Sequence, residues 1–180
     1  CAIFTEEETD SLLYGSKKSD PQVILVTALA QSLAEWTGSK TVLFDQYHHG
    51  RDALPASIDT SHTTGFFISH NPMVIDLSEG YAPEAGLATV QKQFRNVPNK
   101  GYGYDLLRCL SGDLEISNKL NSLPRSEVLF NYRGRLTDIF ADSALFRLSP
   151  ELRGSVDDPR GISITATHDP HGIRYYPVSI

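Results

Sequence analysis

Residues 45–52, with the sequence DQYHHGRD, bring together side chains that could do acid–base or metal chemistry. A zinc site needs ligands that meet on one side of an element, together with a third ligand. His48 and His49 are adjacent and follow a β-favouring run, and neighbouring side chains in a strand point to opposite faces. The spacing therefore disfavours a metal site on this pair. It favours one imidazole packed inward through a hydrogen bond and the other in solvent.

A short surface helix is predicted near the start of the chain. Thr5 and Glu8 have the spacing of a capping box, in which each side chain bonds the other residue's backbone N–H. Gly15 suits the end of such a helix, which would cover residues 5–14.

The elements that lead into the histidine pair are a long helix and a strand. Asp20 is suited to the N-cap, Pro21 to the first helical position and Gly38 to the C-cap. Residues 23–30 are apolar on nearly every side, so we expect this helix to lie deep in the core. The β-rich run 41–47 follows, which places the histidines at or just past the end of a strand.

A second strand is predicted over residues 63–77, TTGFFISHNPMVIDL. Proline removes a donor from a strand ladder, so we expect an interruption at Asn71-Pro72, with a bend or a sheet edge there. A further helix should run from Pro83 towards Pro98, because its apolar residues fall on one face: Leu87, Val90 and Phe94.

The rest of the chain predicts shorter elements. Residues 98–104 form a glycine-rich loop ahead of a short helix, in which Cys109 is expected as a small core residue. Residues 126–132 predict a strand that ends at Gly134, and the turn 168–172 predicts a closing hairpin. Helices and strands are mixed without an internal repeat, which predicts one α/β lobe.

Two enzyme classes are disfavoured by their missing motifs. Gly101-Tyr102-Gly103 begins like a dinucleotide fingerprint, but Leu106 replaces its third glycine and no strand precedes it. A tight turn that uses glycines at positive φ is favoured instead. No G-x-S-x-G sequence is present, which removes support for a serine hydrolase of that type.

Composition narrows the partners and the setting. The 180 residues carry a net charge of −6, with a pI of about 5.4, so nucleic acid is not an expected partner. No apolar run approaches the roughly 20 residues of a membrane helix, and no membrane partner is expected. With Cys1 and Cys109 as the only cysteines, a reducing, cytoplasmic setting is predicted. The chain begins at Cys1 without an initiator Met, and we expect it to be a piece truncated at both ends.

Five stretches, taken in order, resemble the C-terminal half of the condensation and epimerisation domains of nonribosomal peptide synthetases. Each is similar to one family motif, and together they span residues 20–135 in the family's order. The five stretches are VILVTALAQSLAEWTG, DQYHHGRD, TTGFFISHNPMVIDL, VPNKGYGYDLLRCL and VLFNYRGRL.

The resemblance implies a fold and a set of partners. The fold would be one lobe of the two-lobed, α/β chloramphenicol acetyltransferase-like fold, with residues 1–180 as the C-terminal part of a condensation-like domain. The partners would be an N-terminal condensation lobe and acyl or peptidyl carrier proteins. Substrates would be carried as thioesters on the carriers' phosphopantetheine, with no cofactor bound directly. The parent would form amide bonds between these thioesters.

The same resemblance separates catalytic from supporting residues. The family's H-H-x-x-x-D-G motif belongs to the N-terminal lobe, and His48-His49 does not match it, so this chain should be inactive alone. His49 matches a strand-end histidine of the family. Tyr47 stands where epimerisation domains have a glutamate, and a phenol with a pKa near 10 is a poor base at pH 7. Because they match these family positions, Tyr47 and His49 are the catalytic candidates. The weak basicity of the Tyr47 phenol favours a condensation-type parent over an epimerisation domain.

Substrate-binding roles are implied for three residues. Arg51 would hold a carboxylate or a backbone carbonyl, and Asn131 and Tyr132 would orient the thioester or the pantetheine arm. The alternative for each is an ordinary strand-end hydrogen bond. The chain departs from the family pattern at Phe66, Asp105 and Arg133, where the family has Trp, Gly and Leu. An epimerisation domain, a non-catalytic remnant and a carrier-protein docking lobe remain as alternatives.

Overall fold

The computed structural model describes residues 4–15, 20–53, 57–132, 134, 176 and 178–180. The chain divides into two compact units, one made of Cys1–Asn131 with Tyr176–Ile180 and the other of Tyr132–Tyr175. Only Tyr132 and Gly134 are described in the second unit, so every element below belongs to the first. The predicted closing hairpin around 168–172 lies outside the described residues.

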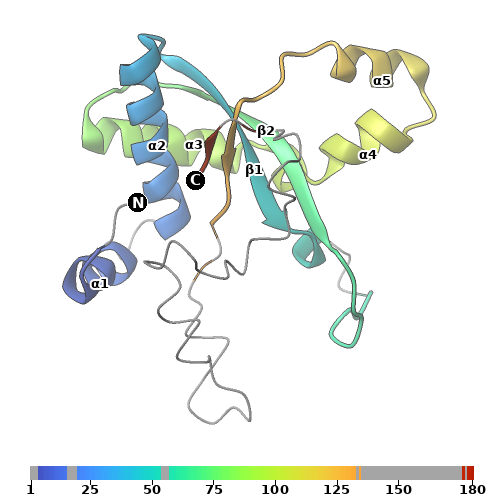
Figure 1. Ribbon diagram of the computed structural model, residues 1–180, viewed down its shortest axis with the longest axis horizontal. Helices are drawn as coiled ribbons and strands as arrows, with labels where there is room; N and C mark the ends of the chain where they lie inside the picture. The colour runs from blue at the N-terminus through green and yellow to red at the C-terminus, as the bar shows by residue number, and fades with distance from the viewer. Residues whose placement is uncertain (1–3, 16–19, 54–56, 133, 135–175, 177) are drawn as a thin grey trace, which may run out of the picture. The chain divides into compact units, whose positions relative to one another are not determined.

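Helices and strands follow one another in a mixed order, as Figure 1 shows. They are α1 (Glu6–Tyr14), α2 (Pro21–Thr37), β1 (Thr41–His49), the 3₁₀ turn η1 (Gly50–Ala53), β2 (Ile68–Asp76), α3 (Pro83–Arg95), the 3₁₀ turn η2 (Pro98–Gly101), α4 (Gly103–Leu110), α5 (Leu114–Asn121), β3 (Val128–Phe130) and β4 (Val178–Ser179).

The first two helices begin and end where their caps predict. Thr5 and Glu8 form the reciprocal capping box of α1, which buries none of its residues. The Asp20 side chain accepts a hydrogen bond from the Gln22 N–H at the start of α2, and Gly38 ends that helix at φ 70°. Both predictions are confirmed, because these signals act within one turn of chain.

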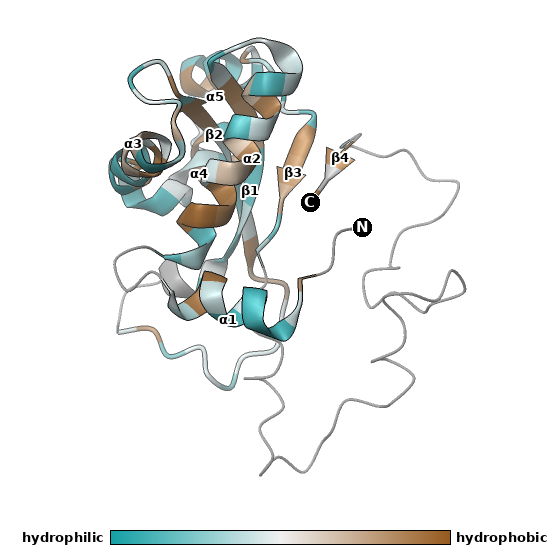
Figure 2. Cartoon of the chain, turned by 90° about the vertical axis from the view of Figure 1, so that its left-hand side faces the viewer, coloured by the Kyte–Doolittle hydropathy of each residue, from teal (hydrophilic) through white to brown (hydrophobic). Residues whose placement is uncertain are grey.

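The described strands form one sheet in the order β2-β1-β3-β4. β1 and β2 are antiparallel over their whole length, with Tyr47 opposite His70 and Phe44 opposite Met73. β3 runs parallel to β1, and β4 runs parallel to β3. Figure 2 shows β3 as hydrophobic, in keeping with its three buried residues.

Strand alternation gives the β1–β2 pair two different faces. The covered face carries the alternate residues that pack under the helices: Val42, Phe44, Gln46 and His48 of β1, with Ser69, Asn71, Met73 and Ile75 of β2. The open face carries the other set, none of which is fully buried: Leu43, Asp45, Tyr47 and His49, with Ile68, His70, Pro72 and Val74.

The core lies between the covered face and the pair α2–α3. α2 packs against β1 and α3, and α3 packs against β2. Phe44 and Ile75 are fully buried there, as are Val26 and Ala30 of α2 and Val90 of α3. The predicted deep position of α2 is confirmed.

The predicted interruption at Asn71-Pro72 is wrong, although the predicted sheet edge is right. The Leu77 N–H bonds to the Lys40 carbonyl beside β1, whereas the Asp76 N–H points away, to Gln93. Backbone direction alternates along a strand, so Pro72, like Asp76, directs its nitrogen away from β1. The missing donor therefore falls on the side of β2 that has no neighbouring strand among the described residues, and the ladder continues.

Other differences from prediction concern the limits of single elements and the burial of single residues. β1 extends through both histidines, since its pairing with β2 continues to His49. The strand predicted over 126–132 is limited to Val128–Phe130. Cys109 is exposed rather than in the core, because α4 buries none of its residues. The helix α5, capped by Asp113, was not predicted.

Candidate functional site

Polar side chains gather on the open face near the carboxyl end of β1. Asp45, Tyr47 and His49 lie one strand period apart on this face, and His70 lies across from Tyr47 on β2. The rings of Tyr47 and His70 meet edge to face, with centroids 6.4 Å apart. Tyr47 and His70 are half-buried, while His49 is exposed. Both catalytic candidates, Tyr47 and His49, therefore share one accessible surface.

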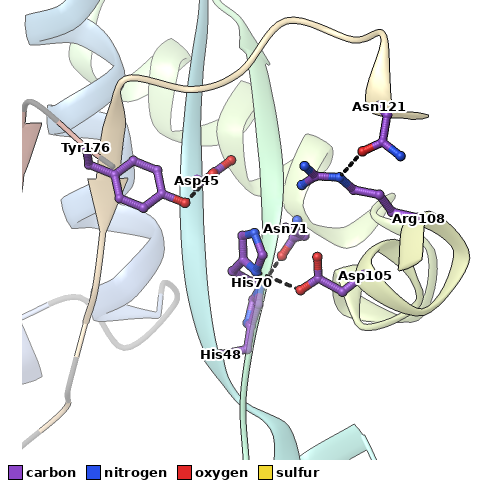
Figure 3. A network of polar contacts seen from close by, with 8 residues as sticks. All are labelled: Asp45, His48, His70, Asn71, Asp105, Arg108, Asn121 and Tyr176. Atoms are coloured by element: carbon purple, nitrogen blue, oxygen red, sulfur yellow. Dashed lines mark hydrogen bonds and ion pairs between the residues drawn. The ribbon is translucent and has the colours of Figure 1, made fainter. Parts of the chain in front are cut away.

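Asp45 is held by a residue from the far end of the chain. The Tyr176 hydroxyl donates to Oδ2 of Asp45 over 2.6 Å, as Figure 3 shows. Burial raises the pKa of Tyr176 well above its usual value, and its hydrogen bond to the Asp45 carboxylate adds to that rise. Tyr176 is thus a neutral donor at any physiological pH.

A second carboxylate reaches the open face from α4. Oδ2 of Asp105 lies 2.6 Å from Nδ1 of His70, and both side chains are about one-third exposed, at 32% and 30%. Figure 3 shows the pair meeting between β2 and α4. Asp105 and His70 are 35 residues apart in the sequence, so the pair is made by folding rather than by a local motif.

His48 turns to the covered face, opposite to His49. Its Nε2 lies 2.6 Å from Oδ1 of Asn71, which is buried. Burial lowers the pKa of His48, and the hydrogen bond to Asn71 opposes part of that shift. The predicted arrangement of one inward, hydrogen-bonded imidazole and one exposed imidazole is confirmed for His48 and His49.

The glycine-rich loop closes over Asn71. Gly101 has φ 85°, and a Cβ added there would collide with the Asn71 side-chain amide. The ring of Tyr102 lies 5.4 Å from that of His48. Gly103 has no such constraint and starts α4, so the predicted positive-φ turn holds for Gly101 and is wrong for Gly103.

Arg51 anchors the chain that follows it. Its two terminal nitrogens donate to the carbonyls of Thr60 and Thr63 over 2.8 and 2.9 Å. The guanidinium carbon lies 4.1 Å from the ring centroid of Phe67. These contacts use both terminal nitrogens of the fork, so a ligand would have to compete with two backbone carbonyls.

The other two binding candidates lie at and beyond the end of β3. Phe130 pairs with Gln46, so Asn131 lies at the level of Tyr47, and its N–H donates to the Ile180 carbonyl over 2.8 Å. Tyr132 belongs to the second compact unit. Tyr47, His49 and Asn131 therefore lie at one end of the sheet, while Arg51 lies in the turn after β1.

Among the described residues, two side chains on the covered face, Gln46 and Ser69, have buried polar atoms without a hydrogen-bond partner. Gln46 is fully buried, and neither its amide nitrogen nor its amide oxygen meets a hydrogen-bond partner in the described part of the chain. An amide buried in this way costs about 1–3 kcal/mol of stability. Gln46 lies next to Asn71 across the strands, so the covered face changes from apolar to polar towards this end.

Metal chemistry and membrane insertion find no support in the described part of the chain. Its residues contain no group of three or more His, Cys, Asp or Glu side chains placed to hold an ion. Of the helices described, none combines the length and the hydropathy that crossing a bilayer requires.

Sequence reasoning missed the His70–Asp105 pair. The only signal was Asp105 itself, a charged residue where the resembling family has glycine. No spacing rule joins it to His70, because the contact requires α4 to pack against the edge strand β2.

Comparisons with known proteins place this geometry in context. Residues 5–152 match the family described as the condensation domain. The chain is 35% identical over 157 residues to a linear gramicidin synthase protein from Brevibacillus parabrevis, covering 84% of this chain and 3% of that protein. It is 28% identical over 179 residues to gramicidin S synthase 1 from Brevibacillus brevis, covering 98% of this chain and 16% of that protein.

A solved structure is similar to the described fold. It is the crystal structure of the epimerization domain from the third module of tyrocidine synthetase B, with a TM-score of 0.63 and 26% sequence identity. The likeness covers 72% of this chain and 30% of that one. The chain thus spans a small part of the length of the proteins it resembles.

Proposed function

The chain belongs to the condensation domain family of nonribosomal peptide synthetases, and from this premise we propose that it forms one wall of a site for amide formation between carrier-bound thioesters. Its α/β elements are one lobe of the chloramphenicol acetyltransferase-like fold. The family prediction made from the five motifs is thereby confirmed. The activity is proposed, because the chain matches only a small share of each large relative.

The observation that carries the proposal is the open face. It is a strand surface with partly exposed polar side chains, reached from α4 by Asp105, and it holds the candidates Tyr47 and His49 at the end where Asn131 follows β3. A second lobe with the H-H-x-x-x-D-G motif would face it, and the aminoacyl and peptidyl groups would enter on the phosphopantetheine of carrier proteins. Arg51 completes the proposed binding set in this unit, and a binding role for Tyr132 is a separate prediction for the second unit.

Amide formation tests the proposal directly. The intact gene product is mixed with a donor and an acceptor carrier protein, each loaded with its aminoacyl thioester, and the product on the acceptor is identified by mass spectrometry. A new dipeptidyl thioester is expected, and none from residues 1–180 alone. Failure of the intact protein to form any amide with loaded carriers would overturn the proposal.

Epimerisation is the second candidate, favoured by the solved epimerization domain among the similar structures. Tyr47 stands against it, because a phenol is a weak base near pH 7. Replacing Tyr47→Glu should raise exchange of the α-proton of a carrier-bound peptide with deuterated water if the protein is an epimerase. No rise in this exchange would remove that candidate.

A carrier-protein docking lobe is the remaining alternative. Such a lobe would bind carrier proteins in every variant and catalyse no reaction. The cytoplasmic setting stays a prediction.

A further inference from the structure

His70 and Asp105 form a carboxylate–histidine pair outside the residues so far assigned a role. Nδ1 of His70 and Oδ2 of Asp105 are 2.6 Å apart, and about one-third of each side chain is exposed. Figure 3 shows the pair beside the separate contact of Asp45 with Tyr176. A bound molecule can therefore reach the imidazole from the open face.

The pairing determines which ring nitrogen is available. A carboxylate only accepts hydrogen bonds, so Nδ1 of His70 carries the proton that lies against Asp105. In the neutral ring, Nε2 then keeps its lone pair, and within the described part of the chain it has no hydrogen-bond partner. A carboxylate that orients a histidine in this way is the arrangement by which enzymes activate an imidazole as a base.

The charge around His70 suits a cationic ligand. The titratable groups that gather on this face are Asp105 from α4, three residues of β1 (Asp45, Tyr47 and His49), and Tyr176 before β4. A phenol is uncharged near pH 7, so Asp45 and Asp105 are the source of negative charge among these groups. A protonated amino group would be drawn to this negative surface.

We propose that His70, oriented by Asp105, is the group that takes a proton from the α-ammonium of an aminoacyl thioester bound on the open face. This role rests on the amide-forming function proposed above, and assigns a proton acceptor to this lobe. In peptides, histidine has a pKa of about 6.5 and an α-amino group one of about 7.7–8.0. A proton therefore passes between two such groups at little cost, whereas a phenolate at about 10 is hardly populated at pH 7.

The step balances without any further reagent. The α-ammonium gives one proton to Nε2, which frees the lone pair of the amine. The amine nitrogen bonds to the carbonyl carbon of the donor thioester, and the carbon–sulfur bond breaks. The proton that this nitrogen loses on amide formation goes to the leaving thiolate, and the imidazolium returns its own proton to water.

The pH profile of the intact gene product tests this role with matched variants. His70→Asn keeps a short donor towards Asp105 and lacks Nε2, and His62→Asn removes an exposed histidine in a loop as the control. His70→Asn should slow amide formation about tenfold or more at pH 7 and approach the wild type above pH 9, where the amine is already neutral. Added imidazole should restore part of the rate at pH 7. An equal loss at every pH would show a structural role and overturn the proposal.

A second readout does not depend on turnover. Diethylpyrocarbonate acylates unprotonated imidazole nitrogens, and mass spectrometry of the His70 and His62 peptides measures each reaction. The probe is an aminoacyl pantetheine amide, with nitrogen in place of the thioester sulfur. It should protect His70 at least severalfold and leave His62 unchanged, and Asp105→Asn should weaken this protection.

The two readouts separate the possible failures. If the wild type forms no amide but the amide probe still protects His70, the proposed function fails and the ligand site on His70 stands. If the probe leaves His70 as reactive as His62, the proposal for His70 fails whatever the activity.

Discussion

The two faces of the β1–β2 pair share the same strands and differ in what they do. On the covered face, Phe44 and Ile75 are fully buried, and Phe44 meets Phe130 edge to face at 6.3 Å. On the open face, Val74 is 59% exposed, His49 is exposed, and the other polar residues are only half-buried. Because side chains alternate along a strand, one stretch of chain can build a core and present a reactive surface together.

The histidines show the same contrast at atomic scale. His48, on the covered face, engages Asn71 through Nε2, so the outer end of its ring is occupied. His70, on the open face, engages Asp105 through Nδ1, and its Nε2 has no hydrogen-bond partner among the described residues. The same residue type is thus used once for packing and once in a position that suits proton transfer.

The two faces should differ most in how much their side chains contribute to the stability of the fold. Phe44→Ala removes a fully buried ring and should lower the free energy of unfolding by about 3–5 kcal/mol, measured by urea unfolding of the chain. The matched change on the open face is Val74→Ala, which should cost less than about 1 kcal/mol. Equal losses for the two variants would mean that the open face is packed as tightly as the core.

The next effect concerns the loop that closes over Asn71. Gly101→Ala should destabilise the chain by about 2–4 kcal/mol, because the new Cβ adds positive-φ strain and collides with the Asn71 amide. Gly103→Ala is the control, since space is open there and alanine favours a helix. The midpoint of thermal unfolding should fall for Gly101→Ala and not for Gly103→Ala. An unchanged midpoint for Gly101→Ala would contradict the described loop.

A change within the covered face should increase stability. Gln46→Met replaces an unsatisfied buried amide by an apolar side chain of similar length, which should raise the free energy of unfolding by about 1–2 kcal/mol. Gln93→Met offers a contrast, because the Gln93 amide bonds to the Asp76 backbone and its loss should destabilise. A less stable Gln46→Met would indicate that a polar group meets this amide.

The smallest effect is the pH dependence that His48 contributes. Burial lowers its pKa in the folded chain, so between that value and about 6.5 the unfolded chain binds more protons. Its contribution to stability is therefore present above about pH 6.5 and is lost as the pH falls through the folded pKa. Urea unfolding at several pH values between 5 and 8 gives the free energy of unfolding as a function of pH. This free energy should change less steeply with pH for His48→Gln than for the control His62→Asn. Unchanged slopes would place His48 in solvent.

Local signals were sufficient for much of the fold. The caps Thr5, Asp20 and Gly38 act within one helical turn, so sequence predicts the limits of α1 and α2 closely. The order of five motifs predicted the condensation domain family, which residues 5–152 confirm. The alternation of β1 likewise predicted that His48 and His49 diverge.

The errors arose where a residue's environment depends on distant chain. Pro72 was expected to interrupt a strand, and it does not, since β2 turns that nitrogen away from its partner strand. Cys109 was expected in the core, and it is exposed because α4 buries no face. Neither the order of strands in a sheet nor the packing of a helix can be predicted from a stretch of a few residues.

By itself, the sequence determined the helix limits, the alternation of β1 and the family, because each depends on short-range chemistry or on ordered motifs. Only the tertiary structure decided which residues share the open face. The packing of α4 beside β2 brings Asp105 to His70, and the return of the chain end to the sheet brings Tyr176 to Asp45. Contacts between residues far apart in sequence form only when packing brings their elements together, so their chemistry cannot be read from spacing along the chain.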